Sequence, residues 1–178
     1  MFMKIYNTLS HKEEVFIPWE EGKVSFYTCG PTVYHYAHIG NMRNYIGHDI
    51  LDKTLRFIGF DVTRCMNITD VGHLTSDSDS GDDKMVASAK KEHKSVLDIA
   101  SFYTDAFFKD FDALNCKRPE IVSNATDNIE EYIKIITKLL EDGYAYKAGG
   151  NVYFDTSKLK DYYVLTNHKE DDMVVGAR

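Results

Sequence analysis

Side chains that could bind a metal ion or a phosphate gather in residues 29–41. Cys29 carries a thiol, and a thiolate can act as a soft metal ligand or as a nucleophile, although many cysteines are only small buried apolar groups. His38 and Asn41 flank Gly40 and carry groups that can hydrogen bond to phosphate oxygens. The stretch therefore predicts a thiolate role for Cys29 and an anion-binding role for His38 and Asn41.

A zinc ion held jointly by Cys29, His35 and His38 is a weaker interpretation of the same stretch. Their spacing does not match a zinc finger, and a histidine just before a helix is better suited to binding an anion. We favour Cys29 as a single metal ligand whose partners come from elsewhere in the protein.

These residues lie where a strand should give way to a helix. Residues 24–28 form a short apolar, β-prone run that Cys29, Gly30 and Pro31 end, and Gly40 and Asn41 then open a helix. A phosphate can bind at such a helix N-terminus, where unpaired N–H groups meet the positive end of the helix dipole. The expected apolar stripe of this helix, which Gly59 should end, consists of Ile46, Ile50, Leu51, Leu55 and Ile58.

A second strand over residues 61–68 would complete a β-α-β unit, which predicts an α/β fold with a parallel sheet. Ligands of such folds bind at the carboxyl ends of the strands. We therefore expect Thr69 and Asp70, which follow this strand, to face the same cleft as Cys29 and His38.

The remaining elements follow from periodicity and turn signals. Residues 77–83 are acidic but lack the spacing of a calcium loop, so we interpret them as a solvated loop. We expect short strands at 3–9 and 14–17 beside the main sheet, helices at 83–93, 95–114 and 127–143, and a hairpin over 144–155. Ser95 with Asp98, and Asp127 with Glu130, should cap the last two of these helices.

Composition places the chain among globular proteins of the cytosol. It has 178 residues, a net charge of −7, three widely spaced cysteines, and neither a long apolar run nor a signal peptide. The negative charge argues against non-specific coating of nucleic acid but leaves room for a local basic patch. We expect a cytoplasmic monomer that does not associate with a membrane.

Four runs of sequence, TCGPTVYHYAHIGNMRNY, NITDVGHLTSD, DFDALNCKRPE and GNVYFDT, resemble the bacterial cysteinyl-tRNA synthetases. The resemblance covers almost the whole chain, and the Cys-Gly-x-Thr run is specific within class I. It implies an ATP-dependent activation of L-cysteine, followed by transfer to tRNA(Cys). It also implies the first half of a class I Rossmann-type catalytic domain at residues 1–113 and the start of an inserted α+β connective domain at 114–178.

The resemblance also implies roles for individual residues. Cys29 would be the first ligand of one Zn²⁺ per chain, whose other ligands lie beyond Arg178, as does the Lys-Met-Ser-Lys-Ser loop of the family. ATP, with Mg²⁺, would contact the residues of the signature, with His38 and Asn41 as the catalytic pair. Asn41 stands where the family usually has a second histidine, so it can donate a hydrogen bond but cannot carry a charge. The cysteine pocket would contain Gly30, Thr32 and Thr69, and the ATP site would contain His38, Gly40 and Asn41.

Two alternatives stay open at the level of sequence. A related ligase that joins cysteine to an amino sugar, in the biosynthesis of a thiol cofactor, would share the zinc and adenylate chemistry. A truncated, non-catalytic binding module could keep part of the cleft without the lysine loop.

Overall fold

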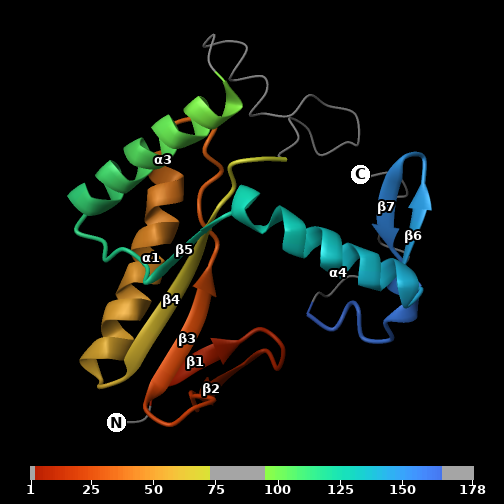
Figure 1. Cartoon of the computed structure of the whole chain (residues 1–178). Helices are drawn as coiled ribbons and strands as arrows, with labels where there is room; N and C mark the ends of the chain where they lie inside the picture. The colour runs from red at the N-terminus through yellow and green to blue at the C-terminus, as the bar shows by residue number, and fades with distance from the viewer. Residues whose placement is uncertain (1–2, 73–94, 166–178) are drawn as a thin grey trace. The chain divides into compact units, whose positions relative to one another are not determined.

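The computed structural model describes residues 3–72 and 95–165, which divide into two compact units (Figure 1). The first unit takes in the described residues between 17 and 126. The second combines those before 17 with those after 126. The expected sequence boundary between residues 113 and 114 stays a prediction.

A three-stranded parallel sheet forms the centre of the first unit. Its strands are β3 (Lys23–Thr28), β4 (Asp61–Ile68) and β5 (Ile121–Asn124), in the order β3-β4-β5. Val24 pairs with Val62 and Cys65 pairs with Ile121, so β4 is central. The α/β class with a parallel sheet is confirmed, whereas the short strand β5 was not predicted.

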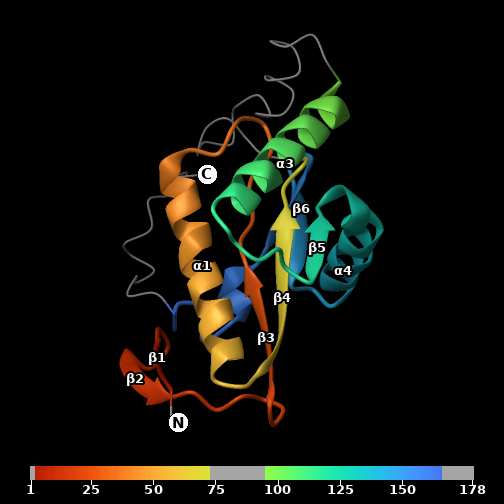
Figure 2. The same ribbon diagram turned by 90° about the vertical axis from the view of Figure 1, so that its left-hand side faces the viewer.

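Two helices cover the same face of this sheet (Figures 1 and 2). They are α1 (Ile39–Phe57), which links β3 to β4 as predicted, and α3 (Val96–Ala113). Ser95 accepts from the Asp98 N–H in the predicted capping box of α3. Gly59 has φ +102° just after α1, a left-handed conformation that glycine adopts without strain.

The hydrophobic core lies between the helices and β4. Strand β4 alternates in burial, with Val62, Arg64, Met66 and Ile68 turned towards the helices. Tyr103, Phe107, Phe108 and Phe111 of α3 pack in this core, whereas Phe102 and Leu114 are exposed. The core cluster consists of Val33, Met42, Tyr45, Met66, Ile68, Ile99, Ala100, Tyr103, Phe107, Phe108, Phe111 and Cys116.

The buried face of α1 differs from the predicted apolar stripe. Ile50 is 59% exposed, while Asp49 and Asp52 are buried beside Leu55. The buried face of α1 is thus rotated about the helix axis relative to the predicted stripe. Hydrophobic periodicity could not predict this difference, because it treats carboxylates as solvated residues. Buried carboxylates need hydrogen bonds or opposite charges, and here other elements supply both.

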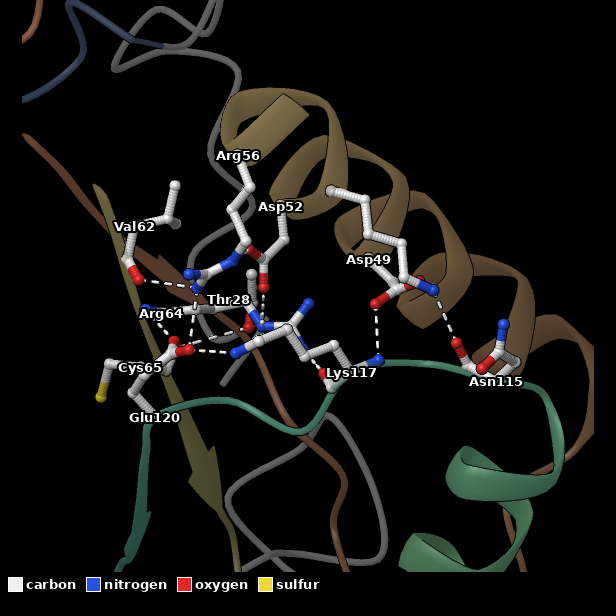
Figure 3. Close-up of polar contacts among 11 residues, drawn as sticks. Thr28, Asp49, Asp52, Arg56, Val62, Arg64, Cys65, Asn115, Lys117 and Glu120 are labelled. Atoms are coloured by element: carbon white, nitrogen blue, oxygen red, sulfur yellow. Dashed lines mark hydrogen bonds and ion pairs between the residues drawn. The ribbon is translucent and has the colours of Figure 1, made fainter. Parts of the chain in front are cut away.

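Two arginines share the carboxylate of Asp52 (Figure 3). Arg56 Nε donates to Oδ1 at 2.6 Å, and Arg64 Nε forms an ion pair with Oδ2 at 3.6 Å. Asp52 and Arg64 are both 0% exposed, so this ion pair is fully enclosed. Arg56 Nη2 also donates to Val62 O at 2.6 Å and to Glu120 Oε1 at 2.8 Å. Asp52 therefore connects α1 to β4 through Arg64, and Arg56 extends this network to Glu120, just before β5.

Side chains of α1 also hold the segment that connects α3 to β5 (Figure 3). Lys117 N donates to Asp49 Oδ1 at 2.7 Å, and Lys53 Nζ donates to Asn115 O at 2.6 Å. Burial would raise the pKa of Glu120, but hydrogen bonds from Lys117 Nζ and the Arg64 N–H lower it to about 2. These contacts fix the start of β5.

The second unit contains two antiparallel hairpins and one longer helix. In the first hairpin, β1 (Lys4–Asn7) pairs with β2 (Lys12–Val15), so these strands pair with each other and not with the main sheet. The second hairpin, β6 (Ala145–Ala148) with β7 (Asn151–Phe154), is close to its predicted position. A short 3₁₀ turn, η2 (Thr156–Lys158), follows it.

Helix α4 (Ile129–Glu141) follows a 3₁₀ turn, η1 (Thr126–Asn128), and contacts β6. Its N-cap is Asn128, which makes no side-chain capping bond, so the expected cap by Asp127 is wrong. The chain enters α4 directly from the 3₁₀ turn, which leaves Asp127 inside η1 instead of at the helix start. Gly143 ends the helix with φ +75°, as predicted.

Two predicted segments, the acidic loop at 77–83 and the helix at 83–93, lie outside the described residues. None of the helices within residues 3–72 and 95–165 combines the length and the hydropathy of a transmembrane span.

Candidate functional site

The turn after β3 places the Cys29 thiol at the carboxyl end of the sheet. Cys29 is exposed and is not part of a disulfide. The next N–H, that of Gly30, donates to Asn67 Oδ1 at 2.8 Å. A Cβ at Gly30 would lie 1.7 Å from the backbone oxygen of Asn67, so any other residue would push the turn away from β4. Glycine is therefore needed here for close packing of two strand ends.

Backbone hydrogen bonds also join the segments that follow β3 and β4. Thr69 N donates to Pro31 O at 2.9 Å, and Val33 N donates to Thr69 O at 3.1 Å. Thr32 and Thr69 consequently form a parallel bridge. The two threonines predicted for the cysteine pocket thus lie side by side.

His38 and Asn41 close the N-terminus of α1 through a reciprocal capping box. His38 Nδ1 accepts from the Gly40 N–H at 3.0 Å, and Asn41 Oδ1 accepts from the His38 N–H at 3.1 Å. Because Nδ1 accepts, the neutral ring carries its proton on Nε2. Because Oδ1 accepts, the Asn41 Nδ2 group is directed away from the cap. The capping box thus leaves His38 Nε2–H and the Asn41 Nδ2 group as donors that the cap itself does not use.

A cavity of about 320 Å³ lies between the β3–α1 loop and the aromatic residues of α3. Tyr45 forms part of its wall, and burial, with a smaller effect from Cys29, raises the pKa of Tyr45 to about 12. The phenol therefore stays protonated at neutral pH. The wall consists of Gly30, Pro31, Thr32, Val33, Tyr34, His35, Tyr36, Ala37, His38, Asn41, Tyr45, Tyr103 and Phe107.

The predicted site residues take different positions around this cavity. Gly30, Thr32, His38 and Asn41 lie in its wall, at the strand end and at the helix N-terminus. The remaining three, Cys29, Thr69 and Gly40, lie in adjoining positions outside the wall. Thr69 reaches the wall through its hydrogen bond with Pro31, and Gly40 through its bond with His38.

Asp70 has a different place from the one expected. Its carboxylate is buried and accepts from Thr126 N at 3.0 Å and from Thr126 Oγ1 at 2.5 Å. It thereby fixes the chain just beyond β5 and does not line the cavity beside His38.

Cys29 is the residue that could hold a metal ion. Within residues 3–72 and 95–165, no group of three or more His, Cys, Asp or Glu residues is arranged to bind one. The accessible, unbonded thiol fits the role of one soft ligand of a zinc site whose other ligands lie elsewhere.

Three residues of the site were not singled out from the sequence, although Tyr45 and Asn67 lie within two of the quoted runs. Asn67 bonds to the Gly30 turn, and Tyr45 and Tyr103 line the cavity. The two tyrosines follow the helical period and so resemble ordinary core residues. Asn67 lies in the predicted strand 61–68, but two of its partners, Tyr27 in β3 and Gly30 in the turn after it, are distant in the sequence.

The sequence matches the family model described as "tRNA synthetases class I (C) catalytic domain" over residues 15–178. It is 57% identical over 178 residues to the cysteine–tRNA ligase of Treponema denticola, covering 100% of this chain and 36% of that protein. The identity is 49% over 176 residues with the cysteine–tRNA ligase of Treponema pallidum (strain Nichols), covering 99% and 34%. It is also 49% over 169 residues with that of Zymomonas mobilis, covering 95% and 33%. The chain spans about a third of the length of these relatives.

Proposed function

We propose, from the premise that the chain belongs to the family of class I (C) tRNA synthetase catalytic domains, that it forms the N-terminal part of a cysteine–tRNA ligase. The observation that carries this proposal is the cavity at the end of β3, where the Gly30 turn meets the capped N-terminus of α1. An anion is favoured at such a helix start by the positive end of the helix dipole. The substrates proposed for this site are L-cysteine, ATP with Mg²⁺, and tRNA(Cys).

The proposed chemistry has two transfers. A cysteine carboxylate oxygen attacks the α-phosphorus of ATP, and the bond to the leaving pyrophosphate breaks, giving cysteinyl-adenylate. A ribose hydroxyl of tRNA(Cys) then attacks the cysteinyl carbonyl and AMP leaves. Neither transfer needs a protein nucleophile, so the protein acts by positioning the reactants and stabilising phosphate charge.

His38 and Asn41 would contribute hydrogen-bond donors to the phosphates. The capping box uses His38 Nδ1 and Asn41 Oδ1, so Nε2–H and the Nδ2 group are the atoms that can donate to a ligand. Gly40 supplies a backbone N–H to the same cap and leaves room for close approach of a ligand. The cap thus orients the very side chains that would bind ATP.

Selection of cysteine over serine would depend on Cys29. A zinc ion bound through this thiolate would hold the substrate thiolate far better than the hydroxyl of serine. The exposed thiol supports this role. Gly30, Thr32 and Thr69 would surround the bound cysteine, because they meet at the same two strand ends.

Substitutions of His38 should separate its capping role from its role in phosphate binding. His38→Ala removes both roles, so it should lower ATP–pyrophosphate exchange and destabilise α1 by about 1 kcal/mol. His38→Asn keeps a capping acceptor but removes Nε2–H, so exchange should fall by a similar factor while the melting temperature stays unchanged. An exchange rate in His38→Asn equal to that of the unsubstituted enzyme would show that His38 is only a cap.

Charging of tRNA(Cys) with cysteine by the full-length protein tests the proposed function. We expect cysteinyl-tRNA to form in the presence of ATP. A folded full-length protein that charges an amino sugar and leaves tRNA(Cys) uncharged would contradict the proposal.

A further inference from the structure

We propose that Asn67 is a positioning residue of the cysteine site. Its side chain fixes the Cys29–Gly30 turn and also orients the Thr69 hydroxyl. The inference rests on the functions proposed above for Cys29 and Thr69. It adds a residue that contacts neither substrate and acts through the groups that do.

The side-chain amide of Asn67 makes three hydrogen bonds. Its Oδ1 accepts from Gly30 N at 2.8 Å and from the Tyr27 hydroxyl at 2.6 Å. Its Nδ2 donates to Thr69 Oγ1 at 2.9 Å. One residue of β4 thus contacts the end of β3, the turn after β3 and the start of the next segment.

The orientation of this amide follows from its partners. A backbone N–H can only donate, so the side of the amide that faces Gly30 must be the oxygen. Nδ2 then faces Thr69 as a donor, and the Thr69 oxygen is its acceptor. The Thr69 proton must therefore point away from Asn67, which leaves the hydroxyl able to donate to another group.

The bond to Gly30 also fixes the backbone of Cys29. The Gly30 N–H and the Cys29 carbonyl belong to one planar peptide unit, so holding the N–H sets the orientation of the whole unit. The Cys29 Cα, from which the thiol projects, lies in the same plane. The turn lies so close to β4 that a Cβ added at Gly30 would be 1.7 Å from Asn67 O, so glycine is required beside Cys29.

Asn67 lies on the face of β4 opposite the hydrophobic core. Met66 and Ile68, its neighbours in the strand, are both 0% exposed and face the helices, whereas Asn67 is half-buried on the other face with Cys65. Truncating Asn67 therefore leaves the core packing of the first unit in place. Its loss should affect the site more than the fold.

The experiment uses three variants of the full-length protein. Asn67→Ala removes all three bonds, whereas Asn67→Asp keeps the acceptors for Gly30 and Tyr27 but removes the donor to Thr69. Thr63→Ala, on the same exposed face of β4, is the matched control. Two readouts are taken: Co²⁺ titration, followed by the absorption of the cobalt–thiolate bond, and KM values for cysteine and ATP in pyrophosphate exchange.

We expect Asn67→Ala to weaken Co²⁺ binding and to raise the KM for cysteine, each by about 10–100-fold, as loss of a partner behind a metal ligand does elsewhere. The KM for ATP should stay unchanged, because no bond of Asn67 reaches His38 or Asn41. Asn67→Asp should keep the Co²⁺ affinity but still raise the KM for cysteine, because only the Thr69 contact is altered. Thr63→Ala should match the unsubstituted enzyme in all readouts.

Unchanged Co²⁺ affinity and cysteine KM in Asn67→Ala would overturn the proposal. A joint rise of both KM values with a lower melting temperature would also overturn it, because that pattern indicates a merely structural residue. If Asn67→Ala does not fold, the cysteine KM of Asn67→Asp decides. Absence of cysteine-dependent exchange in the unsubstituted enzyme would refute the proposed function instead, and the Co²⁺ titration would still test the effect of Asn67 on Cys29.

Discussion

Replacing Cys29 by serine in the full-length protein is expected to remove bound zinc and cysteine activation together. A serine hydroxyl is a far poorer zinc ligand than a thiolate, and the exposed Cys29 makes no disulfide that the change would disrupt. Loss of a direct ligand should cost at least about 100-fold in activity, the upper end of what loss of an outer partner costs. Zinc content and cysteine-dependent pyrophosphate exchange, measured on the same preparation, give the result.

Cys65→Ser provides the matched control for this prediction. Cys65 is a half-buried free thiol on β4, and its backbone oxygen, not its thiol, accepts from Thr28. Zinc content and exchange should therefore remain those of the unsubstituted enzyme. Full zinc content in Cys29→Ser would refute Cys29 as a ligand.

Asp52→Ala should destabilise the first unit by about 3–5 kcal/mol, the usual cost of breaking a buried ion pair by removing one partner. Arg64, which is 0% exposed, would keep its charge in the interior without the carboxylate. Arg56 would lose its 2.6 Å bond to the same group. Hydrogen exchange of the α1 and β4 amides in the full-length protein measures this free energy locally.

Two comparisons distinguish a buried charge from simple loss of a contact. Glu20→Ala breaks an exposed ion pair with Lys23, which should cost less than about 1 kcal/mol. Combining Asp52→Leu with Arg64→Met replaces the enclosed pair by apolar groups and should recover most of the lost stability. An effect of Asp52→Ala as small as that of Glu20→Ala would contradict the account of this network.

Elements with long, regular patterns could be predicted from sequence. The β3–α1–β4 unit and the Ser95 cap of α3 needed only alternation, helical spacing and local capping residues. The four-residue strand β5 was missed, because its pairing with β4 and its fixation through Glu120 both depend on distant partners. The burial of Asp52 was missed for the same reason, since Arg64 belongs to another element.

The candidate site shows a similar division. His38 and Asn41 could be placed at the helix start because their capping partners lie within three residues. Gly30 was singled out for its place in the turn, but the reason for glycine, the backbone oxygen of Asn67, lies 37 residues away in the chain. Asp70 was expected to face the cleft beside His38, but its carboxylate accepts a hydrogen bond from Thr126 instead. Nothing in the sequence indicated that Thr126 lies near β4.

Cysteine-dependent ATP–pyrophosphate exchange on the full-length protein, with serine as competitor, tests the central claim most directly. We expect exchange with cysteine but not with serine, from a preparation that carries about one zinc ion per chain, as a single catalytic site requires. A folded, zinc-loaded protein that catalyses no exchange with cysteine would contradict the proposed adenylate chemistry and would favour a non-catalytic binding module.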